Sequence, residues 1–106
     1  MVKRNIVWTE TAMKQRRHIL AYWIKRNGST KYAEKLIQLI KEHLKVILNN
    51  PQAFKTTDYK DVRESALGHF SIYYRFTDKQ IIVMAFWDNR QSPKKLLKSI
   101  LENKNI

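Results

Sequence analysis

The chain has 106 residues, and its 21 lysines and arginines outnumber its 9 aspartates and glutamates, so its formal charge at pH 7 is +12. This length predicts one domain over residues 1–106, and a hydrophobic content of 43% is enough for a packed core. The chain contains no cysteine, which excludes disulfides, thiol catalysis and cysteine-bound zinc. The excess of positive charge favours an anionic partner, which can be a nucleic acid, an acidic protein or an anionic membrane.

The sequence also indicates where the protein acts. No apolar run approaches the length of about 18 residues that a membrane-spanning helix needs, so no membrane partner is expected. The segment Met1–Ile6 has the basic residues of a signal peptide but lacks its apolar stretch. The absence of cysteine fits a reducing compartment. We therefore expect a cytoplasmic protein.

The N-terminal half predicts a strand and two helices. Residues 4–8 alternate in polarity as a short strand does, and Thr9 is a suitable N-cap for the helix that follows. Asn27-Gly28 predicts the end of that helix. A second helix, capped by Ser29 or Thr30, has apolar residues at helical spacing and ends before Pro51. Its apolar residues are Ala33, Leu36, Ile37, Ile40, Leu44, Ile47 and Leu48. The two helices are expected to form an antiparallel hairpin.

The C-terminal half predicts three strands and a last helix. A loop over residues 51–58 leads to a strand around Val62-Arg63-Glu64, and Gly68 then marks a turn that needs a positive φ. Residues 70–77 form the next strand. Residues 81–87 are apolar on both faces, as in a central strand, and Ser92-Pro93 predicts the start of the last helix.

The strand over residues 70–77 has two different faces. Its apolar face carries Phe70, Ile72, Tyr74 and Phe76, and its second face carries Ser71, Tyr73, Arg75 and Thr77. The first face is expected to join the core. The second is expected to stay partly open, with a tyrosine and an arginine available to a partner.

The order of elements, β-α-α-β-β-β-α, predicts an α+β fold. Its sheet is small and packs on the helical hairpin. The long connection after the first strand implies that this strand lies beside the last one, where its pairing can be parallel. The hairpin then covers one face of the sheet.

Three segments, in this order, carry a resemblance to a known family. They are Ile6-Val7-Trp8-Thr9-Glu10-Thr11-Ala12, the strand with Val62-Arg63-Glu64, and Phe86-Trp87-Asp88-Asn89-Arg90-Gln91-Ser92-Pro93. Nearly the whole chain resembles the RelE/ParE superfamily of toxins from bacterial type II toxin–antitoxin modules. The resemblance implies a RelE/ParE-like fold with a twisted, mainly antiparallel sheet. It also implies neutralisation by a cognate antitoxin, which we expect to be acidic.

The resemblance implies one of two activities. RelE-like members cut messenger RNA on the ribosome by turning a 2′-hydroxyl against its own 3′-phosphate, which requires a proton acceptor, a proton donor and cations. ParE-like members poison DNA gyrase, which requires only a binding surface. RelE-like enzymes place an arginine after the aromatic residue that opens the second strand of the β-hairpin, but here Ser71 follows Phe70. This departure and the long helical hairpin favour the ParE-like branch.

For an RNA-cutting toxin, four residues are candidates for catalysis: Arg63, Arg90, Tyr73 and His69. Arg63 resembles the basic residue carried on the preceding strand, and Arg90 the arginine just past the final strand. Tyr73 shares a strand face with Ser71, and His69 can act as an acid or a base near neutral pH. Whether the protein is an enzyme therefore stays open.

The remaining candidates are basic residues that contact nucleic acid through phosphate charge: Arg75, Lys60, Lys94 and Lys95. No cofactor is expected. No metal site is expected either, because His18 and His43 lie on separate helices without a carboxylate or histidine at ligand spacing.

Each candidate also has a structural interpretation. Arg63 is expected to pair with Glu64 or Asp61 if it has no functional role, and the lysines of the last helix then form a solvated face.

The expected target depends on the activity. It is the ribosome with messenger RNA for an RNA-cutting toxin, or DNA gyrase for a ParE-like toxin. A further alternative is a basic nucleic-acid-binding module outside any toxin system.

Overall fold

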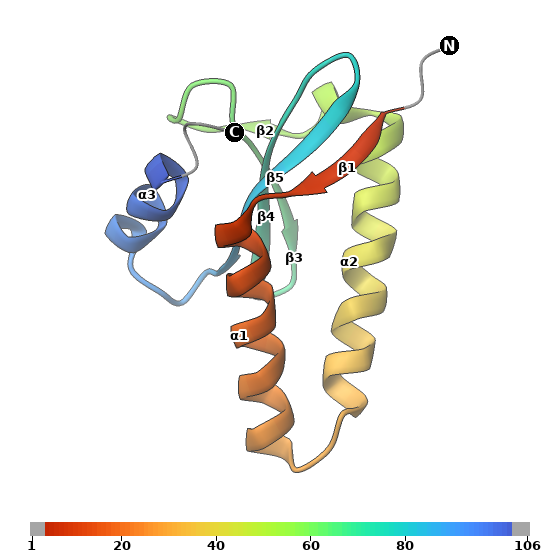
Figure 1. Ribbon diagram of the computed structural model, residues 1–106, viewed down its shortest axis with the longest axis vertical. Coiled ribbons are helices and arrows are strands. Elements are labelled where there is room, and N and C mark those ends of the chain that lie inside the picture. Colours follow the sequence, from red (N-terminus) through yellow and green to blue (C-terminus); the bar gives the residue numbers. More distant parts are fainter. Residues whose placement is uncertain (1–3, 103–106) are drawn as a thin grey trace.

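The computed structural model describes residues 4–102, and its elements follow the predicted order (Figure 1). Met1–Lys3, part of the segment compared above with a signal peptide, lie outside the described residues. The elements are β1 (Asn5–Trp8), α1 (Glu10–Asn27), α2 (Lys31–Asn49), the 3-10 turn η1 (Pro51–Ala53), β2 (Lys55–Thr56), β3 (Arg63–Leu67), β4 (Phe70–Phe76), β5 (Gln80–Asp88) and α3 (Pro93–Glu102). The α+β prediction is confirmed. The short β2 lies within the loop that the sequence predicts over residues 51–58. A strand of two residues is too short to show alternating polarity, so no pattern indicated it.

Local signals in the sequence end the helices and turns as predicted. Thr9 has an extended backbone (φ −65°, ψ 158°), and its Oγ1 accepts a hydrogen bond from the Ala12 N–H over 3.1 Å. Gly28 ends α1 and Gly68 joins β3 to β4, each with φ 61° in the left-handed region that suits glycine. These signals fix the lengths of α1 and of the β3–β4 hairpin.

The five strands form one mixed sheet in the order β1-β5-β4-β3-β2. Strand β1 pairs parallel with β5, so that Asn5 lies opposite Gln80, while the other pairs are antiparallel. The register between β4 and β5 shifts at Tyr73 and Tyr74. The expectation that the first strand lies beside the last one is confirmed, and the pairing is parallel.

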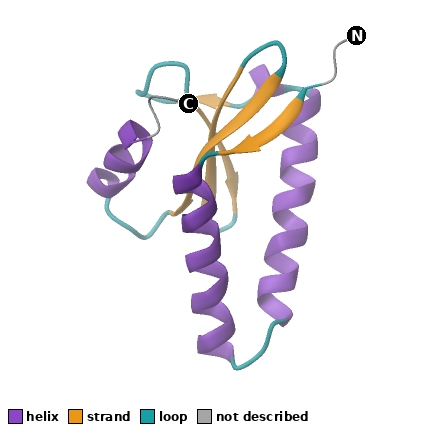
Figure 2. Ribbon diagram, viewed as in Figure 1, coloured by secondary structure: helices purple, strands orange, loops and turns teal. Residues whose placement is uncertain are grey.

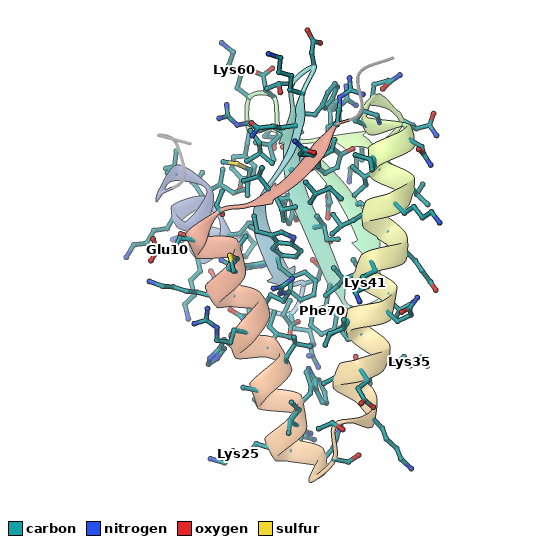
Figure 3. All side chains as sticks on the ribbon, turned by 45° about the vertical axis from the view of Figure 1, so that its right-hand side comes forward. Glu10, Lys25, Lys35, Lys41, Lys60 and Phe70 are labelled. Carbon is teal, nitrogen blue, oxygen red and sulfur yellow. The ribbon has the colours of Figure 1, made fainter. Side chains whose placement is uncertain are left out.

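The helical hairpin packs on the apolar face of the sheet. Phe70 lies between the sheet and the hairpin (Figure 3), and its ring stacks on Phe86 with centroids 5.5 Å apart. The buried residues of this main core include Leu36, Ile40, Leu44, Ile47, Ile72, Tyr74, Ile81 and Val83. The helical stripe predicted for α2 therefore faces the core except at Ile37, which is 39% exposed. The tip of the hairpin projects beyond the sheet (Figure 1).

The second face of the sheet is covered by α3, so the prediction of an open face was wrong at Ser71 and Tyr73. Both residues are buried. Leu96 and Ile100 of α3 pack with Tyr73, Ala85, Trp87 and Val62 in a second cluster. Figure 2 shows the helices on both sides of the strands. The alternation correctly separated the two faces of β4, but it carried no information about what covers the second face.

Across residues 4–102, no helix combines the length and the apolar character that crossing a membrane requires. The α2 helix has 19 residues, but charged side chains cover its outer side. This finding agrees with the absence of long apolar runs in the sequence.

Candidate functional site

The structure separates the candidate catalytic residues between the two ends of β4. Arg63 opens β3 and lies opposite Tyr74, near the end of β4, whereas His69 and Arg90 lie beyond the start of β4 and the end of β5. Tyr74 and Phe70, which lies opposite Asp88, are four residues apart, about 13 Å along β4. The guanidinium of Arg63 extends past Tyr74 to the Phe76 ring, and that of Arg90 lies near the Trp23 ring of α1, so the two groups point apart and do not hold one phosphate group together.

Tyr73 belongs to a buried polar cluster under α3. Its hydroxyl donates a hydrogen bond to Glu64 Oε2 over 3.1 Å, and the Ser71 hydroxyl donates to the same oxygen over 2.9 Å. Burial, followed by the nearby Glu64 carboxylate, raises the pKa of Tyr73 to about 12. At neutral pH Tyr73 is therefore a protonated donor. The position where the RelE-like arginine would stand is filled by a serine that completes this cluster.

Arg90 is engaged by Asp88. Its Nε and Nη2 donate to the two carboxylate oxygens of Asp88 over 2.9 and 2.7 Å, and its backbone N–H donates to Oδ1 over 3.0 Å. This bidentate pair holds the pKa of Asp88 below its usual range. The guanidinium also lies 5.7 Å from the Trp23 ring of α1. Arg90 is thus positioned against the hairpin rather than against the Glu64 cluster.

His69 lies in the turn between β3 and β4. Its carbonyl accepts a hydrogen bond from the Asn89 N–H over 2.9 Å, which places it at the same end of the sheet as Arg90. Its side chain is exposed. The structure therefore brings His69 near Arg90 and keeps it away from Arg63 and the buried Tyr73.

Arg63 points to the hairpin face of the sheet, while its neighbour Glu64 points to the α3 face. Arg63 Nη1 donates to the Phe54 carbonyl over 2.7 Å, and its guanidinium carbon lies 5.9 Å from the centre of the Phe76 ring. No ion pair joins Arg63 to Glu64 or Asp61 within residues 4–102. The half-buried guanidinium is held by a carbonyl and a ring instead.

The basic candidates lie in two regions. Lys60 is exposed in the loop between β2 and β3, where it lines a hollow together with Arg63 and Arg75. Lys94 and Lys95 are exposed in the first turn of α3. In the part of the chain that the structure describes, no group of three or more histidines, cysteines and carboxylates is arranged to hold a metal ion.

One hollow involves residues that the sequence analysis did not select. It has a volume of about 430 Å³ between β1, α1 and α2, and its lining is Ile6, Trp8, Arg16, Leu20, Ile37, Ile40, Lys41 and Leu44. We call it the β1–hairpin groove. Arg16 lies 4.4 Å from the Trp8 ring, and Ile37 is 39% exposed. In the sequence, Arg16 stands at helical spacing among the apolar residues Ala12, Leu20 and Trp23 of α1, and this cation within an apolar stripe was the available signal.

The chain is similar to known proteins in both sequence and fold. The family model described as the ParE toxin of type II toxin–antitoxin system, parDE, matches residues 6–93. A structure of the chromosomal ParDE toxin–antitoxin system from P. aeruginosa aligns with a TM-score of 0.67 and 24% identity, over 79% of this chain and 94% of that chain. The E. coli DinJ–YafQ toxin–antitoxin complex aligns with a TM-score of 0.49 and 12% identity, over 84% and 96%. No curated protein sequence matches the chain.

Proposed function

The chain belongs to the ParE toxin family of type II toxin–antitoxin systems, and from this premise we propose that its single domain, residues 1–106, stops bacterial growth by binding DNA gyrase. The separation of the candidate catalytic residues is the observation that supports binding over RNA cleavage. Arg63 and Arg90 occupy opposite ends of the sheet, and Tyr73 is a buried donor to Glu64. A cleavage site requires its acid, base and cations around one phosphate.

We propose that an acidic antitoxin neutralises the toxin at the β1–hairpin groove. Its apolar lining suits the apolar face of a partner segment, and Arg16 and Lys41 at the groove favour acidic residues beside that face. Strand β1 is also an edge strand of the sheet, so a partner strand can extend the sheet there. The description of the P. aeruginosa structure names a ParDE toxin–antitoxin system, which supports the same kind of partner here.

Ribosome-dependent cleavage of messenger RNA is the second candidate function. The observation in its favour is the hollow lined by Lys60, Arg63 and Arg75, which provides positive charge for a phosphate. Gyrase and the ribosome are both in the bacterial cytoplasm, so a cytoplasmic location is part of either proposal. A nucleic-acid-binding module outside any toxin system is not supported, because the chain belongs to a toxin family.

Inducible expression in a bacterium without the antitoxin tests the proposal. Pulse labelling should show DNA synthesis failing before protein synthesis, and the purified protein should inhibit supercoiling by gyrase. Transcripts cut on the ribosome, with protein synthesis stopping first, would instead establish the RNA-cutting alternative. Unimpaired growth at full expression would contradict both candidate functions.

A further inference from the structure

A further hollow lies between α1 and the end of β5. It has a volume of about 300 Å³, and its walls include Ile19, Tyr22, Trp23, Asp88 and Arg90. We call it the Trp23 pocket. We propose that the toxin docks on its target through this pocket, and that the occupant is an apolar side chain from an acidic segment of a protein. The inference rests on the proposed function, because a toxin that acts by binding requires such a surface.

The charges inside the Trp23 pocket cancel. Arg90 and Asp88 form the bidentate pair described above, with Nη2 2.7 Å from Oδ2. Much of the remaining wall is apolar or aromatic, with Ile19 buried and Trp23 half-buried. Because the guanidinium already shares its charge with a carboxylate, the pocket suits an apolar side chain better than a phosphate.

The aromatic walls are held in place before a partner arrives. The Trp23 ring lies edge-on to Tyr22, with centroids 5.2 Å apart, and tilted against Tyr32 of α2 at 5.0 Å. The guanidinium carbons of Arg26 and Arg90 lie 5.9 and 5.7 Å from the centre of the same ring. Walls that are already packed lose less conformational entropy when a partner binds.

Tyr22 is the exposed anchor of the pocket. Its side chain is 50% exposed, and its hydroxyl accepts a hydrogen bond from Arg26 Nη1 over 3.4 Å. An aromatic ring that is half open to water offers a partner a large area to cover, and its hydroxyl stays hydrogen-bonded at the edge. Tryptophan, tyrosine and arginine are also the residue types that dominate the binding energy of protein interfaces.

The surface beside the pocket is positive. Lys25 and Arg26 lie in the last turn of α1, three and four residues after Tyr22, so they share its side of the helix. Both are exposed, and Figure 3 shows Lys25 close to the tip of the hairpin. The acidic residue of α1, Glu10, pairs with Lys14 at the other end of the helix. Cations around an apolar depression favour carboxylates around the side chain that fills it.

The Trp23 pocket and the β1–hairpin groove use different residues of α1. Arg16 and Leu20 line the groove, Ile19 and Tyr22 line the pocket, and the two linings have no residue in common. A substitution at Tyr22 is therefore expected to weaken target binding and to leave the proposed antitoxin site intact. This separation makes the inference testable in a protein that is still folded and still neutralised.

Tyr22→Ala is the first test, with growth inhibition and antitoxin binding measured on the same protein. The variant should lose growth inhibition at an expression level where the wild type stops growth, while its affinity for the antitoxin changes by less than about twofold. A urea unfolding curve confirms that the variant is folded. Binding to purified gyrase without DNA, measured by biolayer interferometry, should weaken at least about tenfold.

Lys25→Glu and its matched control Lys45→Glu test the acidic character of the partner. Both change an exposed helical lysine, but Lys25 lies beside the pocket and Lys45 lies on α2, outside its lining. Lys25→Glu should weaken gyrase binding about fivefold. Lys45→Glu should weaken it by less than about twofold, through long-range charge alone.

Four results would overturn the inference. The first is a Tyr22→Ala protein that stops growth as the wild type does. The second is equal weakening by Lys25→Glu and Lys45→Glu, which would show diffuse charge attraction. The third is target binding that requires DNA and disappears after nuclease treatment, which would make a nucleic acid the occupant. The fourth is a Tyr22→Ala protein that keeps its toxicity but loses the antitoxin, which would make the antitoxin the occupant.

The growth measurement separates this inference from the gyrase proposal, because it does not depend on which protein is the target. A wild type that stops growth through Tyr22 but leaves supercoiling unaffected would contradict only the gyrase proposal and would support the pocket. Supercoiling inhibited equally by the wild type and by Tyr22→Ala would contradict only the pocket. Unimpaired growth with the wild type would contradict both.

Discussion

The Tyr73 hydroxyl donates its hydrogen bond to Glu64 Oε2, across the β3–β4 pair and beneath α3. The two residues lie directly opposite each other in the register of the sheet. Ser71 donates to the same carboxylate oxygen, so the hydroxyls of Ser71 and Tyr73 are both satisfied inside the protein. Because α3 covers these two residues, they support the fold.

Tyr73→Phe tests whether Tyr73 has a catalytic role. The change removes one hydrogen bond to Glu64 and keeps the ring, so unfolding should become easier by about 1 kcal/mol while growth inhibition persists. The measurements are a urea unfolding curve and colony counts after induction. A stably folded Tyr73→Phe protein that no longer stops growth would contradict the structural role.

Arg90→Ala tests the bidentate pair at the end of β5. Removing the guanidinium should raise the pKa of Asp88 toward its ordinary value, which NMR titration of the carboxyl group can follow. A pKa that is lower in the folded state stabilises the protein at pH values above the ordinary pKa of the group, and this stability is lost as the pH falls. The variant should therefore lose less stability on acidification than the wild type. An unchanged Asp88 titration would mean that the pair does not persist in solution.

Alkaline titration tests the burial of two tyrosines. The pKa values of Tyr73 and Tyr74 are both raised to about 12, primarily by burial. An unfolded chain releases these protons near pH 10, so stability should be fully present below pH 10 and fall as the pH rises toward about 12. Tyrosinate absorbance should show two late-titrating groups while the protein stays folded. Release of the Tyr73 and Tyr74 protons near pH 10 from the folded protein would contradict this burial.

Ile37→Glu tests the β1–hairpin groove as the antitoxin site. Ile37 lines the groove and is 39% exposed, so a carboxylate there should be tolerated by the fold but repel an acidic partner. Binding of the co-expressed antitoxin should weaken at least about tenfold. Val46→Glu is the matched control, since Val46 is 53% exposed on the same helix and does not line the groove. Equal weakening by both variants would place the antitoxin elsewhere.

Leu44→Asp tests the orientation of α2. Leu44 is 7% exposed within the main core, so an aspartate there would bury a carboxyl group without a partner and destabilise the protein by about 3 kcal/mol or more. We expect loss of cooperative unfolding in circular dichroism. Lys45→Asp, which adds a carboxylate at the exposed neighbouring position, should unfold cooperatively. A cooperative Leu44→Asp protein would mean that the hairpin packs through another face.

Most of the fold could be predicted because its signals are local. Thr9, Gly28 and Gly68 mark ends and turns through their own backbone preferences, and the stripe of α2 identifies its buried side. Strand β2 could not be predicted, since its two residues form a strand only by pairing with Arg63 and Glu64. Tertiary contacts, rather than local propensity, decide such short strands.

The candidate site was less predictable than the fold, for a geometric reason. Period-two alternation tells which residues of one strand share a face, and it correctly separated Tyr73 from Tyr74. It does not tell that α3 covers Tyr73, nor that Arg63 and Arg90 lie at opposite ends of the sheet. Those facts depend on how elements that are distant along the chain pack together, and no periodic pattern in the sequence describes that packing.

The parallel pairing of β1 with β5 has a consequence for the synthesis of the protein. Thr9 Oγ1 reaches the carbonyl of Met84, a residue 75 positions later in the chain. The hairpin of α1 and α2 can form early from local contacts, but β1 has no partner until β5 has been translated. A nascent chain on the ribosome therefore stays incompletely folded until its last third is made. The time needed to translate the chain through β5 therefore sets the earliest moment at which a molecule can be fully folded.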